Sequence, residues 1–182
     1  MIEFKLNNSA AKARQGEINL NGHIIETPCF MPVGTAATVK TMSASEVSSF
    51  GYKIILANTF HLMLRPGVDI IHKHGGIHDF MKWNGAIITD SGGYQVFSLA
   101  KLRKITKEGV HFSSPIDGKK VFLDSKISIG LQEKFNSDII MQFDECTPYP
   151  ADKITTEKSL DLSLIWGKDS KNSITKEKSN LF

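Results

Sequence analysis

The chain has 182 residues, 41% of them hydrophobic and 23% charged, which suits one soluble globular domain with a real core. No segment approaches the roughly 18 apolar residues of a membrane-spanning helix, and no apolar signal region opens the chain, so we expect a cytoplasmic protein without membrane contact. Cys29 and Cys146 are too few for a disulfide framework or a four-ligand zinc site, and the net charge of +3 permits nucleic-acid contact without requiring it.

The first predicted element is an N-terminal β-hairpin. Residues 18–20 and 23–25 flank Asn21-Gly22, a pair that fits a type I′ turn. We assign residues 1–26 to this hairpin region. Residues 29–33 are a short strand candidate, although Pro32 disfavours a central place in a sheet.

Buried strands and helices then alternate along the chain. The apolar segments that predict strands lie at residues 53–57, 86–89 and 138–142. The first predicted helix runs from Ser43, which has capping-box spacing to Glu46, to about residue 50, and the second runs from Pro66 to Gly75-Gly76. A third helix begins at Asp124 and carries Ile127, Leu131 and Phe135 at helical spacing. A fourth runs from about residue 155 to 168, and we expect it to bury Leu160, Leu164 and the side that carries Trp166.

Two further segments depart from this alternation. Residues 99–123 predict an excursion from the sheet, with short apolar runs at 110–112 and 121–123 around a turn. Residues 169–182 are polar and rich in Lys, Ser and Asn, which predicts a frayed tail.

Apolar strands that alternate with helices predict an α/β fold with a parallel sheet covered on both faces. About four βα units make part of a doubly wound sheet or part of a (β/α)8 TIM barrel, since 182 residues fall below the roughly 200 that a complete barrel needs. We treat residues 1–182 as one domain. In either architecture, ligands bind beyond the carboxyl ends of the strands, so Asp90 and Asp144 are expected to face one pocket.

The most informative segment is Asp90-Ser91-Gly92-Gly93-Tyr94, which follows the strand predicted to end at Thr89. Asp90 can exchange a proton or accept hydrogen bonds from a ligand edge. The two glycines allow close approach of the backbone, and the ring of Tyr94 offers a face for stacking. This combination suits a planar, hydrogen-bonding ligand such as a purine-like base.

Other interpretations of the same residues stay open. Asp90 and Asp144 could bind a divalent metal together with His61, which would make a metal-assisted TIM-type hydrolase. Both aspartates could also be simple loop caps. Cys146 is interpreted as a packing residue, because nothing beside it supplies an obvious base for a thiol nucleophile.

Several motifs occur together in one order: residues 27–35, 58–62, 64–67, 90–98 and 143–150. With these motifs the chain resembles the bacterial tRNA-guanine transglycosylases, also called queuine tRNA-ribosyltransferases. The resemblance extends from the first motif to about Trp166. The resemblance implies a TIM-barrel pentosyltransferase that exchanges the wobble guanine of certain tRNAs for a 7-deazaguanine in queuosine biosynthesis. Its implied partners are therefore tRNA and the guanine or 7-deazaguanine base.

The resemblance also implies roles for individual residues. Asp90 corresponds to the proton acceptor and to part of the base pocket. Ser91, Gly92, Gly93 and Tyr94 correspond to the adjoining substrate loop, with Tyr94 stacking on the base. Asp144 corresponds to a carboxylate that accepts hydrogen bonds from the guanine-like edge.

The chain resembles only the N-terminal half of that family. The second half of the family supplies the aspartate nucleophile, further base-binding residues, most of the tRNA-contacting surface and a Cys/Cys/Cys/His zinc site. We therefore expect a truncated barrel with no cofactor or metal ligand of its own and without independent activity. A homo-oligomer or a complementing chain could complete it. The alternative is a non-catalytic partner or base/tRNA-binding module.

Overall fold

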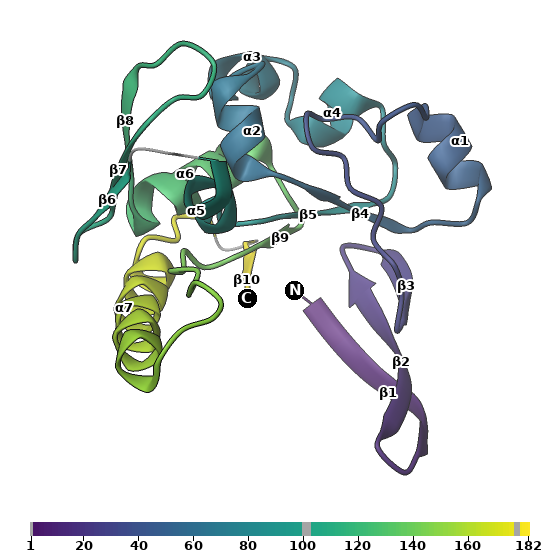
Figure 1. Ribbon diagram of the computed structural model, residues 1–182. Coiled ribbons are helices and arrows are strands. Elements are labelled where there is room, and N and C mark those ends of the chain that lie inside the picture. The colour runs from purple at the N-terminus through teal and green to yellow at the C-terminus, as the bar shows by residue number, and fades with distance from the viewer. Residues whose placement is uncertain (1, 100–102, 177–178) are drawn as a thin grey trace.

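A computed structural model describes residues 2–99, 103–176 and 179–182 of the chain. These residues form a mixed α/β fold with one parallel sheet and two antiparallel sheets, arranged as Figure 1 shows. The helices are α1 (Ala44–Ser49), α2 (Thr59–Leu64), α3 (Val68–Lys73), α4 (Ile77–Met81), α5 (Gly93–Leu99), α6 (Ser125–Phe135) and α7 (Lys153–Asn172).

The parallel sheet has the strand order β4, β5, β9, β10, which is also the order along the chain. Its strands are β4 (Ile54–Ala57), β5 (Ala86–Thr89), β9 (Ile139–Ile140) and β10 (Asn180–Leu181). Helices lie between successive strands in the sequence, because parallel neighbours need a crossover connection. The strands predicted at 53–57 and 86–89 are confirmed, and the third is shorter than predicted. The candidate strand at 29–33 is reduced to one parallel bridge between Val33 and Leu56.

The predicted hairpin is confirmed as β2 (Ala13–Leu20) and β3 (His23–Thr27), in which Leu20 pairs with His23 across the turn. Asn21 and Gly22 both have positive φ angles, as a type I′ turn requires. A third strand, β1 (Ile2–Ala10), pairs with β2 and was not predicted. Its first residues alternate apolar Ile2, Phe4 and Leu6 with polar residues, although almost all of its side chains are exposed.

The excursion after α5 forms the second antiparallel sheet, with strands β6 (Arg103–Ile105), β7 (Val110–Ser113) and β8 (Lys120–Leu123). Both apolar runs predicted there are therefore strands. Asp124 then caps α6, as predicted, by accepting a hydrogen bond from the Ile127 amide at 2.7 Å. Ser43 and Glu46 likewise form the predicted capping box at α1.

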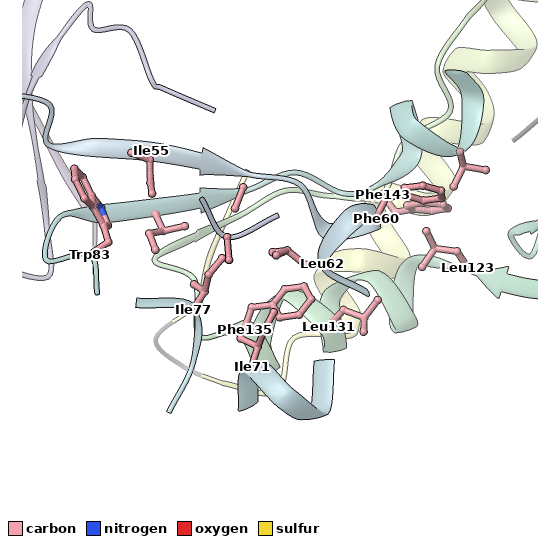
Figure 2. Packing of buried hydrophobic residues seen from close by; sticks show 14 of the residues in the cluster. Ile55, Phe60, Leu62, Ile71, Ile77, Trp83, Leu123, Leu131, Phe135 and Phe143 are labelled. Atoms are coloured by element: carbon pink, nitrogen blue, oxygen red, sulfur yellow. The ribbon is translucent and has the colours of Figure 1, made fainter. Parts of the chain in front are cut away.

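The two faces of the parallel sheet are covered by different structures. On one face Ile55 and Ile87 pack against Ile71 of α3 and Phe135 of α6 in the main core, which Figure 2 shows. On the other face Ile54, Ala86 and Ile139 form a second cluster with Leu20 and Ile25 of the hairpin. Adjacent residues of a strand point to opposite faces, which explains why Ile54 and Ile55 belong to different clusters.

Three predicted elements are corrected. The helix predicted from Pro66 begins at Val68, with Gly67 as its N-cap, and it ends before Gly75-Gly76 as predicted. The short helices α2 and α4, which precede and follow it, were not predicted. In α7, Leu160 and Leu164 are 57% and 64% exposed, whereas Trp166 is buried with Ser159 and Ser170, so the polar face of serines packs inward.

The described residues of segment 169–182 also differ from the predicted frayed tail, since they include the end of a helix and a short strand. Helix α7 continues to Asn172, and β10 pairs with β9 in parallel register. Buried Glu133 of α6 anchors the intervening chain by accepting hydrogen bonds from the amides of Thr175 and Lys176, both at 2.9 Å. These long-range contacts leave no trace in local composition.

Candidate functional site

The site residues lie at the carboxyl ends of two adjacent parallel strands. Asp90 follows β5 and Asp144 lies four residues after the end of β9, and the two strands pair at Thr89 and Ile140. Carboxyl ends of parallel strands meet at one edge of a sheet, so the structure brings the two aspartates to the same edge. Ser91 lies between them and contacts Asp144.

The carboxylate of Asp90 is held by uncharged donors. Its Oδ2 accepts hydrogen bonds from Asn58 Nδ2 at 2.6 Å and from Gln95 Nε2 at 2.9 Å, and its Oδ1 accepts one from the Thr59 amide at 2.8 Å. The Thr59 hydroxyl also donates to the backbone carbonyl of Asp90, at 2.6 Å. The end of β4 and the start of α2 therefore fix the orientation of Asp90.

Burial raises the pKa of Asp90 above its usual range, although the hydrogen bonds from Asn58, Thr59, Gln95 and the Gly92 amide act in the opposite direction. A raised pKa brings a carboxylate closer to the range in which it can accept and return a proton near neutral pH. Asp90 is therefore a chemically suitable proton acceptor held in one orientation.

Asp144 is held through Ser91. The Ser91 hydroxyl donates to Asp144 Oδ1 at 2.9 Å and accepts from the Gly93 amide at 3.1 Å, and Ser91 itself is buried. A Cβ at Gly93 would lie 2.5 Å from the backbone oxygen of Asp144, so only glycine allows this approach of α5 to the loop after β9. Gly92 has a φ of +84°, which also favours glycine.

Buried polar side chains of α6 form hydrogen bonds with the backbone at this edge of the sheet. The Ser128 hydroxyl donates to the Ser91 carbonyl at 2.7 Å. Gln132 bonds the backbone of Met141 twice, its Oε1 accepting from the amide and its Nε2 donating to the carbonyl, each at 2.9 Å, and Oε1 also accepts from the Thr89 hydroxyl at 3.0 Å. One helix thus positions the ends of both strands that carry the aspartates.

Serines of α7 hold the loop that contains Asp144. The Phe143 amide donates to Ser170 Oγ and the Glu145 amide to Ser163 Oγ, both at 3.0 Å. The Ser159 hydroxyl donates to the carboxylate of Glu145. Asp144 therefore lies between two residues whose backbone is fixed by α7.

Two side chains at this edge, Tyr94 and Gln95, could contact a ligand. Tyr94 in the first turn of α5 is 60% exposed, so one face of its ring is open to a ligand. Gln95 Oε1 is buried and accepts no hydrogen bond from the described residues. An unsatisfied buried carbonyl costs about 1–3 kcal/mol, which a donor on a ligand would offset.

The described residues do not fit a metal site. Within residues 2–99, 103–176 and 179–182, no three His, Cys, Asp or Glu side chains come close enough to hold an ion. Cys29 is exposed and Cys146 half-buried, and neither belongs to such a group among these residues. His61 packs edge-on against Phe60 at 5.5 Å, and among the described residues it forms no such group with Asp90 and Asp144.

The thiol of Cys146 is also unsuited to nucleophilic chemistry. Burial, together with the negative charges of Asp144 and Glu145, raises its pKa, which disfavours the reactive thiolate. This agrees with its interpretation as a packing residue. It lines a cavity of about 10 Å³ with Gly93, Phe143 and Trp166, which is room for about one water molecule.

Sequence reasoning missed most of the residues that position the aspartates. Asn58 and Thr59 belong to a motif that was recognised only as a pattern, and Gln95 was given no role. Ser128, Gln132 and Ser170 are buried, although they lie on helices where polar residues usually indicate a solvent-facing side. Their burial became visible only with the packing of α6 and α7.

No described helix is long and apolar enough to cross a membrane. The family model described as "Queuine tRNA-ribosyltransferase" matches residues 9–182. Two relatives named queuine tRNA-ribosyltransferase, from Janthinobacterium sp. (strain Marseille) and Herminiimonas arsenicoxydans, are 56% and 54% identical over 182 aligned residues. In each case the alignment covers 97% of this chain and 48% of the relative, so the chain spans about half the length of the curated relatives it matches. A match over almost the whole chain confirms the resemblance, and the chain belongs to the queuine tRNA-ribosyltransferase family.

Proposed function

We propose that this chain carries the base-recognition and proton-transfer residues of a tRNA-guanine transglycosylase. The substrates are the wobble guanine of tRNA and a free guanine or 7-deazaguanine base. The single observation that supports this most is the pairing of a held Asp90 and a held Asp144 at one edge of the parallel sheet. A guanine-like base presents several N–H donors along one edge, which two carboxylates suit.

Each of the predicted site residues has a role in this proposal. Asp90 accepts and returns the proton of the exchanging base, and Asp144 accepts hydrogen bonds from its donor edge. Ser91 and Gly93 position Asp144, and the exposed ring of Tyr94 stacks on the base. Extracting a base from its stack costs a few kcal/mol, which the stacking and the hydrogen bonds offset.

The covalent step needs a group that holds the ribose while one base leaves and another enters. A carboxylate ester would do this, but we assign no residue of this chain to that nucleophile. The chain therefore contributes recognition and proton transfer, and the ribose-bound intermediate depends on residues corresponding to the other half of the relatives.

We also propose that the parallel sheet is part of a (β/α)8 barrel. The sequential order of β4, β5, β9 and β10, with helices on one face, supports this arrangement. In such a barrel, the edge that carries Asp90 and Asp144 is the one where active sites form. Action on tRNA and the absence of a membrane-spanning helix among the described residues suit a cytoplasmic protein.

The first test measures base binding to the 182-residue chain by calorimetry with guanine and a 7-deazaguanine. We expect Asp90→Asn and Asp144→Asn each to weaken binding by about tenfold or more, since each removes a charged acceptor. Asp69→Asn, an exposed aspartate of α3, is the matched control and should bind as the parent does. Binding that is absent, or equal in all four proteins, would contradict the proposal.

The second test measures exchange of labelled guanine into tRNA. The chain is assayed alone and together with a polypeptide that covers the remaining half of a relative. We expect label in tRNA only in the mixture, and none when Asp90→Asn replaces the parent. Exchange by the Asp90→Asn mixture at the parent rate would remove Asp90 from the proton-transfer step.

A partner module for a full-length relative is the second candidate function. Leu160 and Leu164 are exposed on one helix, which favours a protein contact there. Co-purification with a full-length relative tests it, and a lone monomer under the same conditions would count against it.

A further inference from the structure

We propose that the outward face of the β6–β8 sheet binds single-stranded RNA next to the base site. This deepens the proposed function by naming a surface for the nucleotides that flank the exchanged base. We call it the β6–β8 platform, and its outward side chains are Lys104, His111, Ser113, Lys120 and Phe122.

The register of the sheet places these side chains in two rows. His111 pairs with Lys104 on one side and with Phe122 on the other, so the three form one row across the sheet. Ser113 and Lys120 form the adjacent row. Residues two apart on a strand share a face, which puts both rows on the same surface.

Two aromatic rings lie at the centre of the platform. The ring centroids of His111 and Phe122 are 4.6 Å apart with an interplanar angle of 38°. His111 is exposed and Phe122 half-buried, so part of the ring pair is available to a ligand. The pair lines a surface pocket of about 500 Å³ that also includes Lys104 and Lys120. Aromatic faces on a sheet accept nucleobases by stacking, without dependence on sequence.

The charge of this region complements a phosphate backbone. Residues 103–123 contain five Lys or Arg and two acidic residues, a net charge of +3 that equals the charge of the whole chain. Lys104 and Lys120 are both exposed. Lys104 lies beside His111 in the first row, and Lys120 lies in the adjacent row, two residues from Phe122 on β8. An RNA strand whose base stacks on the rings would thus have these two lysines near its phosphates.

The other face of the sheet is fixed beside the candidate base site. Phe112 packs against Phe60 with ring centroids 5.5 Å apart, and a Cβ on Gly92 would lie 3.5 Å from Leu123. The Arg103 guanidinium lies 4.5 Å from the centre of the Phe97 ring in α5, the helix that begins with Gly93 and Tyr94. Figure 1 shows β6 and β7 beside α5. The platform is therefore the outer face of a sheet whose inner face packs beside the candidate base site.

Fluorescence anisotropy with a labelled anticodon stem-loop RNA tests the platform. We expect Lys104→Ala/Lys120→Ala to weaken binding by about tenfold and to reduce the slope of log affinity against log salt by about two. His111→Ala and Phe122→Leu should each weaken binding by at least about fivefold with a smaller change in slope. Lys5→Ala/Lys12→Ala, two exposed lysines of the β1–β2 hairpin, is the matched control and should bind as the parent does.

Three results would overturn the platform: unchanged affinity in its variants, an equal loss in the Lys5/Lys12 control, or equally tight binding of a duplex RNA of the same length. Guanine binding measured on the same variants separates this proposal from the proposed function. If the chain binds guanine but its RNA affinity does not change in the platform variants, only the platform is refuted. If the RNA affinity falls in the platform variants but the chain does not bind guanine, only the proposed function is refuted.

Discussion

The two ends of the parallel sheet each hold a half-buried aspartate, and their surroundings differ. Asp90, at the carboxyl end, is bound by amide donors of Asn58, Gln95 and the Thr59 backbone. Asp138, at the amino end of β9, accepts from His78 at 2.8 Å and from the Ile87 amide at 2.9 Å. The first aspartate lies four residues before the exposed Tyr94, and the second accepts a hydrogen bond from Asn21 of the N-terminal hairpin at 3.0 Å.

The same contrast appears in the ionisation of the two groups. At Asp90 burial outweighs the hydrogen bonds and raises the pKa. At Asp138 burial also acts upward, but the hydrogen bonds of His78 and Ile87, the charge of His78 and the hydrogen bond of Asn21 together lower the pKa. The carboxyl end thus keeps a carboxylate that can take up a proton, whereas the amino end uses one to join α4, β5 and the hairpin. This division between reactive and stabilising ends is typical of parallel β/α sheets.

The largest effect is expected where the carboxyl end is packed most closely. Gly93→Val should lower the free energy of unfolding by about 1–3 kcal/mol, because the new side chain meets the Asp144 backbone 2.5 Å from its Cβ. Urea unfolding measures this. Gly130→Ala in α6 is the control, since its Cβ meets nothing within 4 Å, and it should stabilise by about 0.5–1 kcal/mol. Equal stabilities for the two variants would contradict the close packing at Gly93.

Neutralising the amino-end aspartate should cost stability without affecting base binding. Asp138→Asn is expected to lower the free energy of unfolding by about 1–3 kcal/mol at neutral pH, because it weakens the bonds to His78 and Ile87. Urea unfolding gives the stability, and calorimetry with guanine gives the affinity. A loss of guanine affinity in this variant would break the contrast between the two ends.

The contributions of the two aspartates to stability should change in opposite directions with pH. The lowered pKa of Asp138 gives stability above the unfolded value of about 3.9, and this is lost as pH falls through the folded pKa. The raised pKa of Asp90 gives stability below about 3.9, and this is lost as pH rises through the folded pKa.

Unfolding measured from about pH 6 down to about pH 3 tests this expectation. The stability advantage of the parent over Asp138→Asn should shrink as the pH falls, whereas the difference between the parent and Asp90→Asn should move in favour of the parent. Parallel curves for both variants would show that the two ends do not differ in ionisation.

The smallest stability effect is expected for Asp90→Asn. The substitution removes a charge whose burial is unfavourable, but it also turns an amide NH2 group toward one of the donors Asn58, Thr59 and Gln95. The two effects oppose each other, so the free energy of unfolding should change by less than about 1 kcal/mol at neutral pH. Its loss of guanine affinity would then be a local effect. A destabilisation as large as that of Asp138→Asn would instead make Asp90 a stabilising residue.

Local sequence signals determined a large part of this protein. The Asn21-Gly22 turn, the Ser43 capping box, the Asp124 cap and the strands that end at Ala57 and Thr89 were all predictable, because each depends on the chemistry of a few neighbouring residues. The order of the motifs around Asp90 and Asp144 was also sufficient to indicate the family.

Only the tertiary structure decided how those elements are used. It turned Ser128, Gln132 and Ser159 inward and left Leu160 and Leu164 exposed, and it paired β10 with β9 through the anchor at Glu133. The physical reason is that burial of a polar side chain depends on a partner far away in the sequence. The residues that hold Asp90 and Asp144 in place are of this kind, so the chain order alone could name the two aspartates but not their supports.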